Sequence, residues 1–222
     1  MKKLALGLVL AVLMAVGAQA EQGVGLGLAY RDSLIGPVVN YTWMFSKYVG
    51  VEARVSYLTG EQDVEVKATE EHFQNGNKIR TAIITIDGDM DVDAIPLEAA
   101  LRFVYPGEKC TPYLLFGGGY YIYDGDVPSF GLGKKTEAES APGFFGALGV
   151  EVRLKGKKKD NMTLFAEIQY TMAQWEVDEE YSGSRSDFVS LFRRLNYDYT
   201  GHQKAEGGLD GVGGIFGVRW KL

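Results

Sequence analysis

The sequence predicts an all-β fold, an eight-stranded antiparallel up-and-down transmembrane β-barrel, and three observations predict it. Polar and apolar residues alternate with period two in segments long enough to cross a bilayer. The connections between these segments alternate between short and long, and one face of each segment is almost free of charge. Together these features are typical of barrels in the outer membrane of Gram-negative bacteria.

The first twenty residues have the three parts of a secretory signal peptide. A lysine pair precedes an apolar run from Leu4 to Val16, and Ala18-Gln19-Ala20 has the small-x-small pattern of a cleavage site. A retained membrane helix is the alternative, but the run is shorter than the roughly 20 residues that a span needs. We therefore expect a cleaved signal peptide at 1–20, a single barrel domain at 21–222 and an outer-membrane location.

Composition excludes several classes of protein. Cys110 is the only cysteine, which rules out a disulfide framework and a structural zinc site made of several thiolates. Without the two lysines of the signal peptide, 21 basic residues face 29 acidic ones, and this negative balance argues against nucleic acid as a partner. We expect no cofactor and no metal.

Eight segments show the alternation, each about 9 to 13 residues long, which suits tilted strands that cross a bilayer. An even number of strands lets the sheet close without an edge. The segments are Gly23–Arg31, Pro37–Phe45, Tyr48–Leu58, Val92–Tyr105, Pro112–Tyr123, Gly143–Leu154, Met162–Gln174 and Leu209–Leu222.

The connections follow the outer-membrane pattern of short periplasmic turns opposite long extracellular loops. The short ones are Ser46-Lys47, Pro106–Thr111 and Lys155–Asn161, and the long polar ones are Thr59–Asp91, Asp124–Pro142 and Trp175–Gly208. Asp32–Gly36 is short on the outer side and departs from the pattern. The isoleucine-rich run Lys78–Asp87 could extend a hairpin above the membrane and present a sheet edge to a partner.

The charged residues of the segments share one face, which we expect to line the lumen. This charge network consists of Glu52, Arg54, Glu98, Arg102, Glu151, Arg153, Glu167 and Arg219. Four acids meet four bases, and unpaired charges in so narrow a lumen are costly, so we predict a salt-bridged plug toward the periplasmic end. The plug either fills and orders the barrel or acts as a gate that opens a small pore when the pairs exchange.

Aromatic residues gather near the ends of the segments, as in the girdles of membrane barrels. The expected girdle consists of Tyr30, Trp43, Phe45, Tyr57, Phe103, Tyr105, Tyr121, Tyr123, Tyr170 and Trp220. A soluble barrel of the lipocalin type is the alternative, but it would scatter charges over its outer face. The nearly uncharged outer face therefore favours the membrane barrel.

Three stretches carry a resemblance to a known family: Ile95–Pro106, Pro112–Tyr121 and the closing Gly213–Leu222. Here the chain resembles the small outer-membrane barrel superfamily, the OmpA-, OmpX- and OmpW-like β-barrel domains. The resemblance spans the mature chain and implies architecture more than activity. It implies contact with outer-membrane lipid and lipopolysaccharide, and a last strand that the barrel-assembly machinery reads. That strand ends in Leu222, where the family more often has phenylalanine.

An enzymatic alternative is a barrel that modifies lipid A, and His202 is the candidate catalytic residue for it. Deacylases of the PagL type carry a catalytic histidine and a serine two residues later, just before the last strand. Here Lys204 stands at the serine position, so acyl transfer lacks its nucleophile.

Asp87–Asp93 is similar to a calcium loop, but Val92 stands where the EF-hand turn requires glycine. An acidic patch is expected there, with a weak divalent-cation site as the alternative.

These features predict a non-enzymatic outer-membrane protein with a structural or surface-interaction role through its long outer loops. A lumen of eight strands is just wide enough for side chains, so a general porin is not expected. The alternatives are a porin-like channel for small or hydrophobic solutes and, less well supported, a lipid A-modifying enzyme.

Overall fold

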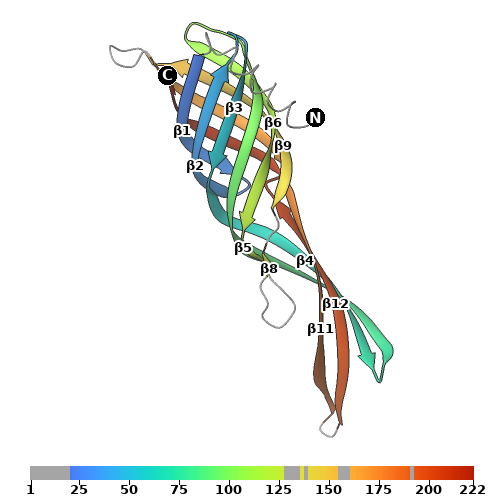
Figure 1. The fold of residues 1–222 in the computed structure, drawn as a ribbon. Coiled ribbons are helices and arrows are strands. Elements are labelled where there is room, and N and C mark those ends of the chain that lie inside the picture. The colour runs from blue at the N-terminus through green and yellow to red at the C-terminus, as the bar shows by residue number, and fades with distance from the viewer. Residues whose placement is uncertain (1–20, 128–135, 138–139, 155–160, 191–192) are drawn as a thin grey trace, which may run out of the picture.

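The computed structural model describes residues 21–127, 136–137, 140–154, 161–190 and 193–222, and the regular structure in these ranges is β-strand (Figure 1). The predicted signal peptide lies outside the described residues. No helix in the described part of the chain is long and apolar enough to cross a membrane.

Eight strands form a closed antiparallel barrel, which confirms the predicted fold. Each strand pairs with the next, and the last pairs with the first. In this order they are β1 (Glu21–Arg31), β2 (Leu34–Met44), β3 (Val49–Ser56), β5 (Asn77–Val104), β6 (Cys110–Asp124), β9 (Ala141–Arg153), β10 (Met162–Met172) and β13 (Gly211–Lys221).

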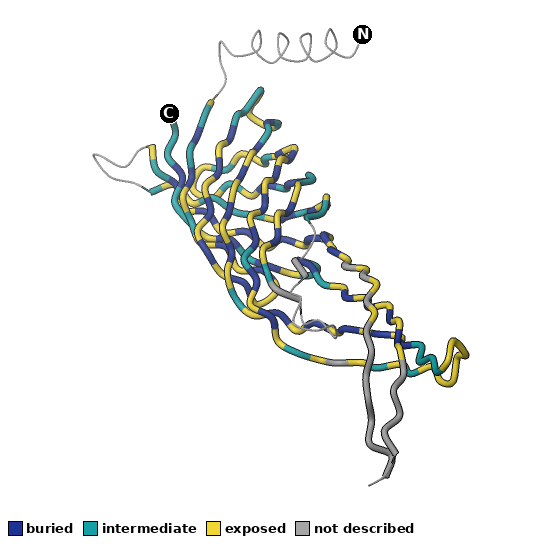
Figure 2. The backbone as a smooth tube through the Cα atoms, turned by 60° about the horizontal axis from the view of Figure 1, so that its bottom comes forward, coloured by how far each residue is buried: buried dark blue, intermediate teal, exposed yellow. Residues whose placement is uncertain are grey.

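Side chains alternate between the lumen and the outer surface along each barrel strand, because the side-chain period of a β-strand is two. In β10, Thr163, Glu167 and Gln169 are buried, whereas Leu164 and Ile168 are exposed on the surface that faces lipid. Figure 2 shows the same alternation of buried and exposed residues around the barrel wall. The barrel thus has an apolar outside and a partly polar inside.

Two of the three long connections are strands and not irregular loops. Thr59–Asp91 contains β4 (Leu58–Gln74) and the outer part of β5, and Trp175–Gly208 contains β11 (Gln174–Ser190) and β12 (Arg193–Gly208). In Asp124–Pro142 only the short pair β7 (Asp126–Val127) and β8 (Thr136–Glu137) is described as strand.

These strands continue the barrel wall into a four-stranded sheet in the order β5–β4–β12–β11, which we call the extracellular sheet after the orientation that the sequence predicts. The sheet projects from the end of the barrel opposite the termini (Figure 1). The β4–β5 hairpin turns at Asn75 and Gly76, which have φ angles of 51° and 79°. An Asn-Gly pair at positive φ is the usual tight turn of a β-hairpin. The run Lys78–Asp87 forms the second strand of this hairpin.

Apolar side chains close the barrel at its outer end. Leu34, Leu58, Trp175 and Leu209 are fully buried in one cluster, and they come from β2, β4, β11 and the turn before β13. Tyr123 of β6 packs in the same cluster and donates a hydrogen bond from its hydroxyl to the carbonyl of residue 173 at 3.1 Å. The first residues of the extracellular sheet therefore seal the outer mouth of the lumen.

We predict that Trp175→Ala lowers the free energy of unfolding by about 3–5 kcal/mol, because the cavity left in a sealed cluster cannot collapse fully. Urea unfolding of the refolded barrel in detergent micelles, followed by its heat-modifiable gel mobility, measures this. Glu180→Ala, on the exposed face of the same strand, is the control and should change the value by about 0.5 kcal/mol or less. Equal effects of the two substitutions would contradict the seal.

Candidate functional site

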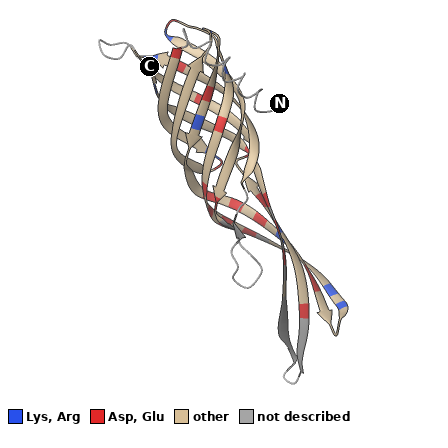
Figure 3. Ribbon diagram, in the orientation of Figure 1, with Lys and Arg blue, Asp and Glu red and all other residues tan. Residues whose placement is uncertain are grey.

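The lumen below the apolar cluster holds four arginines and four glutamates in one network. Its members are Arg31 of β1, Glu52 and Arg54 of β3, Glu98 and Arg102 of β5, Glu151 of β9, Glu167 of β10 and Arg219 of β13. All eight side chains point into the lumen, because successive side chains of a β-strand alternate between its two faces. Figure 3 shows charged residues on the barrel strands as well as along the extracellular sheet.

Arg31 and Glu98 form the outer part of the network. Two hydrogen bonds join them, Nη1 to Oε1 at 2.6 Å and Nη2 to Oε2 at 2.9 Å. Gln169 accepts from Arg31 at 3.1 Å and donates to Glu98 at 3.1 Å. The Tyr121 hydroxyl donates to Glu98 at 2.8 Å. The two terminal nitrogens of the guanidinium are thus matched to the carboxylate, and neutral side chains add further hydrogen bonds. The Nε of Arg31 is buried without a hydrogen-bond partner among the described residues.

Arg54 connects the outer and inner parts. Its Nη2 donates to Glu52 at 2.7 Å and to Glu167 at 2.8 Å, and its Nη1 donates to Gln169 at 3.0 Å. Its Nε lies 3.9 Å from an oxygen of Glu98. A guanidinium has five N–H donors in fixed directions, so one arginine can join carboxylates from three strands.

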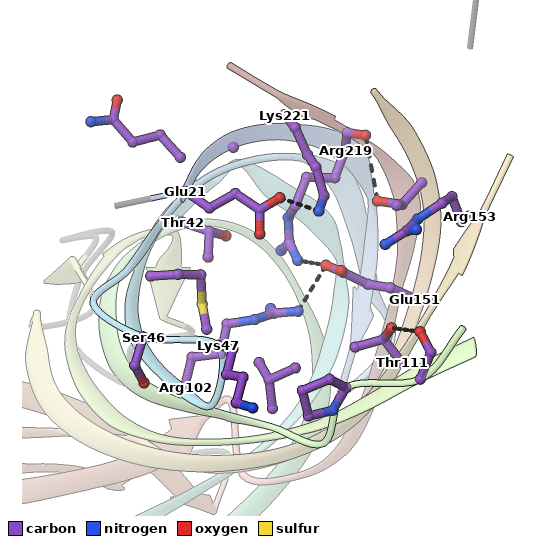
Figure 4. Close-up of a pocket in the computed structure, with 17 residues that line it drawn as sticks. Glu21, Thr42, Ser46, Lys47, Arg102, Thr111, Glu151, Arg153, Arg219 and Lys221 are labelled. Carbon is purple, nitrogen blue, oxygen red and sulfur yellow. Dashed lines mark hydrogen bonds and ion pairs between the residues drawn. The ribbon is translucent and has the colours of Figure 1, made fainter. Parts of the chain in front are cut away.

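Arg102 and Arg219 form the inner part with Glu52 and Glu151. One oxygen of Glu52 lies 2.5 Å from Arg102 Nη1 and 2.9 Å from Arg219 Nη2. Glu151 accepts from Arg102 at 2.7 Å and also from Arg219 (Figure 4). The guanidinium carbon of Arg102 lies 3.5 Å from the centre of the Tyr113 ring, within the range of a cation–π interaction.

A small cavity of 180 Å³ lies between this inner part and the periplasmic mouth (Figure 4). Its wall includes Arg102, Glu151 and Arg219, together with Lys47 and Lys221 near the strand ends. Above the cavity, the side chains of the network are almost fully buried. The cavity is therefore a shallow vestibule that ends at the ion pairs.

The structure brings together seven of the eight predicted network residues, and Arg153 is the exception. Arg153 lies at the last position of β9, where it is still paired with Thr163 of β10, and its side chain is exposed at the rim of the vestibule. Arg31 belongs to the network instead. Gln169 and the hydroxyls of Tyr113 and Tyr121 complete it, and none of the three was among the predicted network residues. Tyr113 donates to Glu167 at 2.7 Å.

Two residues of the predicted aromatic girdle were assigned to the wrong face. Tyr121 and Tyr123 are buried in the lumen, because odd-numbered residues of β6 point inward. Tyr120 and Ile122 are exposed on the outer face instead. The other predicted girdle residues, which are at least partly exposed, are Tyr30, Trp43, Phe45, Tyr57, Phe103, Tyr105, Tyr170 and Trp220.

The remaining candidate residues lie in the extracellular sheet. His202 is on its exposed face, with Nε2 2.8 Å from an oxygen of Asp178. The acidic residues of Asp87–Asp93 lie on β5, where Asp87 and Asp89 stand directly opposite Glu65 and Asp63 of β4. Among the described residues, no group of three or more His, Cys, Asp or Glu side chains is arranged to hold a metal ion.

We predict that Glu52→Gln destabilises the barrel by about 3–5 kcal/mol, because three buried arginines lose a shared carboxylate. Urea unfolding of the refolded protein measures this. Glu21→Gln is the control, since its ion pair with Lys221 is exposed and should contribute about 0–1 kcal/mol. A Glu52 variant as stable as the parent would contradict the assignment of the network as the barrel's internal support.

Comparisons with known proteins agree with this architecture. A family model described as outer membrane protein beta-barrel domain matches residues 4–186. The outer membrane protein OprG from Pseudomonas aeruginosa is similar at 12% identity, over 91% of this chain and 96% of that chain, with a TM-score of 0.56. At this identity the likeness shows a shared fold.

Two further solved structures are similar at lower scores. Ail of Yersinia pestis, in complex with the heparin analogue sucrose octasulfate, has 12% identity over 91% of this chain and 97% of that chain, with a TM-score of 0.40. A major outer membrane protein from Thermus thermophilus has 10% identity over 91% and 99%, with a TM-score of 0.47. A search of curated proteins gives no match.

Proposed function

The chain belongs to the family of outer membrane protein beta-barrel domains, and we propose that it is a non-enzymatic surface protein whose closed barrel anchors an extracellular β-sheet for contact with macromolecules. The observation that carries this proposal is the double closure of the lumen. An apolar cluster fills the outer end, and below it an ion-pair network with matched charges occupies the middle.

The extracellular sheet is the part of the molecule that the barrel leaves free to act. Its strands are continuous with barrel strands: β5 enters the wall at Asp93, and β12 leads into β13 through Leu209 and Asp210. Asp210 ties this junction, because its carboxylate accepts a hydrogen bond from the backbone amide of residue 173 at 2.7 Å. A sheet held in this way presents a fixed surface, as recognition through strand edges requires.

A hydrolytic function is supported less well. Ser182, His202 and Asp178 share the exposed face of β11 and β12 and have the residue types of a catalytic triad. However, no hydrogen bond joins Ser182 to His202 among the described contacts, and His202 and Asp178 are both about half exposed. The nearby backbone amides belong to paired strands, so they are not free to form an oxyanion hole.

We predict that the refolded mature protein gives no discrete openings in a planar bilayer, because both closures are made of packed side chains. A variant with Glu52, Glu98, Arg102 and Arg219 changed to alanine should also stay silent, since the apolar cluster remains in place. Single-channel recording measures both, with heat-modifiable gel mobility as the check of folding. Openings in the parent that change in the variant would contradict the closed barrel and support the porin-like alternative.

A further inference from the structure

The outer part of β5 is an open edge of the extracellular sheet. From Asn77 to Gly88 this strand pairs with β4 on one side, and its pairing with β6 on the other side begins only at Asp93. Among the described strands, none pairs with that free side between Asn77 and Gly88. The N–H and C=O groups there are a template for an added strand.

This edge is apolar in a part of the molecule that lies outside the bilayer. Ile83 is 78% exposed and Ile79 is 55% exposed. Ile83 lies ten residues before Asp93, about 33 Å along the strand at 3.3 Å per residue. Exposed edge strands are usually protected by proline, by lysine or by a bulge. At the tip this edge has Lys78 and a bulge at Ile79, where the pairing steps from His72 to Phe73 of β4. The run Thr81–Ile86 that follows contains no proline or charged residue, and its pairing with β4 is regular.

The charges along this edge have opposite signs at its two ends. Lys78 and Arg80 precede the apolar run near the tip of the hairpin, and Asp87 and Asp89 follow it toward the barrel. Lys78 is also paired with Glu71 of β4. Directly opposite residues of paired strands share a face. Lys78, opposite Phe73, therefore lies on the same face as Asp87 and Asp89, whereas Arg80, opposite His72, lies on the other face. A strand face that is basic near the tip and acidic near the barrel is complementary to the same face of an antiparallel copy. Parallel alignment would instead place its acidic end beside the same acidic end.

We propose that the partner of this edge is a second copy of the chain, bound by antiparallel pairing of the two β5 edges about a twofold axis near Ile83. The two four-stranded sheets then form one continuous sheet of eight strands. Isologous twofold contacts of this kind are the commonest form of self-association. The inference rests on the proposed function, because it names the macromolecule that the extracellular sheet contacts.

Antiparallel pairing also determines where the two barrels lie. In each copy, β5 runs from the tip of the hairpin to its own barrel. When two such strands pair in opposite directions, the barrels lie at opposite ends of the joined sheet. The contact therefore links two opposed membranes, and copies in one membrane do not form it.

Clustering of vesicles tests the proposal. The refolded mature chain is placed in phosphatidylcholine vesicles of two fluorescent labels, and their association is followed by energy transfer and light scattering. We expect the parent to cluster vesicles and Ile83→Lys to slow clustering at least about tenfold, equivalent to about 1.4 kcal/mol. Thr69→Lys is the matched control, because Thr69 lies directly opposite Ile83 but on the internal strand β4. It should cluster like the parent.

Charge reversal tests the antiparallel orientation. One variant carries Lys78→Glu, Asp87→Lys and Asp89→Lys together, so this face of its edge is acidic at the tip and basic toward the barrel. In an antiparallel contact such an edge is again complementary to a copy of itself, so vesicles of the variant should cluster with one another and not with parent vesicles. The introduced lysines face Glu65 and Asp63 across the hairpin, so the hairpin itself should tolerate them. Variant vesicles that cluster with parent vesicles and not with one another would overturn the proposed orientation.

The outcomes also separate this inference from the proposed function. Parent vesicles that stay dispersed, with a folded and electrically silent barrel, would overturn self-pairing and leave the surface role standing. Discrete channel openings in the parent would instead count against the surface role. Equal clustering by Ile83→Lys and the parent would show that the contact lies elsewhere and overturn the assignment to β5.

Discussion

Each charge inside a barrel of eight strands needs a partner inside the barrel, because the lumen is filled by side chains and has little room for water. Arg54 shows how far this constraint reaches, since it contacts carboxylates on its own strand, on β5 and on β10. A slip of one residue in any of these strands would turn a buried charge toward lipid. The ion pairs thus fix the register of the wall as well as filling it.

The alternation of polar and apolar side chains along the strands was enough to predict most of the charged residues that line the lumen. The errors have two different causes. Arg31 was missed because the preceding residues on its face are small, such as Gly27 and Ala29, and give no sign of a charged face. Tyr121 and Tyr123 were assigned to the girdle from their place near a strand end, although their parity directs them inward. Which carboxylate meets which arginine depends on strand tilt and stagger, which a single sequence does not contain.

The extracellular strands were harder to predict for a different physical reason. A strand within lipid needs one uncharged face, and this was the signal used to find strands. Outside the bilayer both faces can carry charge, so β4 and β12 resemble polar loops despite their alternation. On the exposed face Lys204 of β12 lies 2.9 Å from Glu176 of β11 and 2.6 Å from Glu206 of its own strand. Cross-strand pairs such as Lys204 and Glu176 stabilise a sheet that water surrounds.

The contrast between β4 and β5 bears on what the sheet is for. The two strands form one hairpin, and at matched positions the internal strand has Lys67 and Thr69 where the edge strand has Thr85 and Ile83. If β5 served only to complete the hairpin, polar residues like those of β4 would form the same backbone pairs and keep the edge soluble. Apolar residues at an open edge are instead stabilised when a further strand pairs with it. The backbone of that strand forms hydrogen bonds with the unpaired N–H and C=O groups of β5, and its side chains cover Ile83. The proposed contact with a second copy accounts for Ile83 at this open edge, opposite Thr69 of the internal strand.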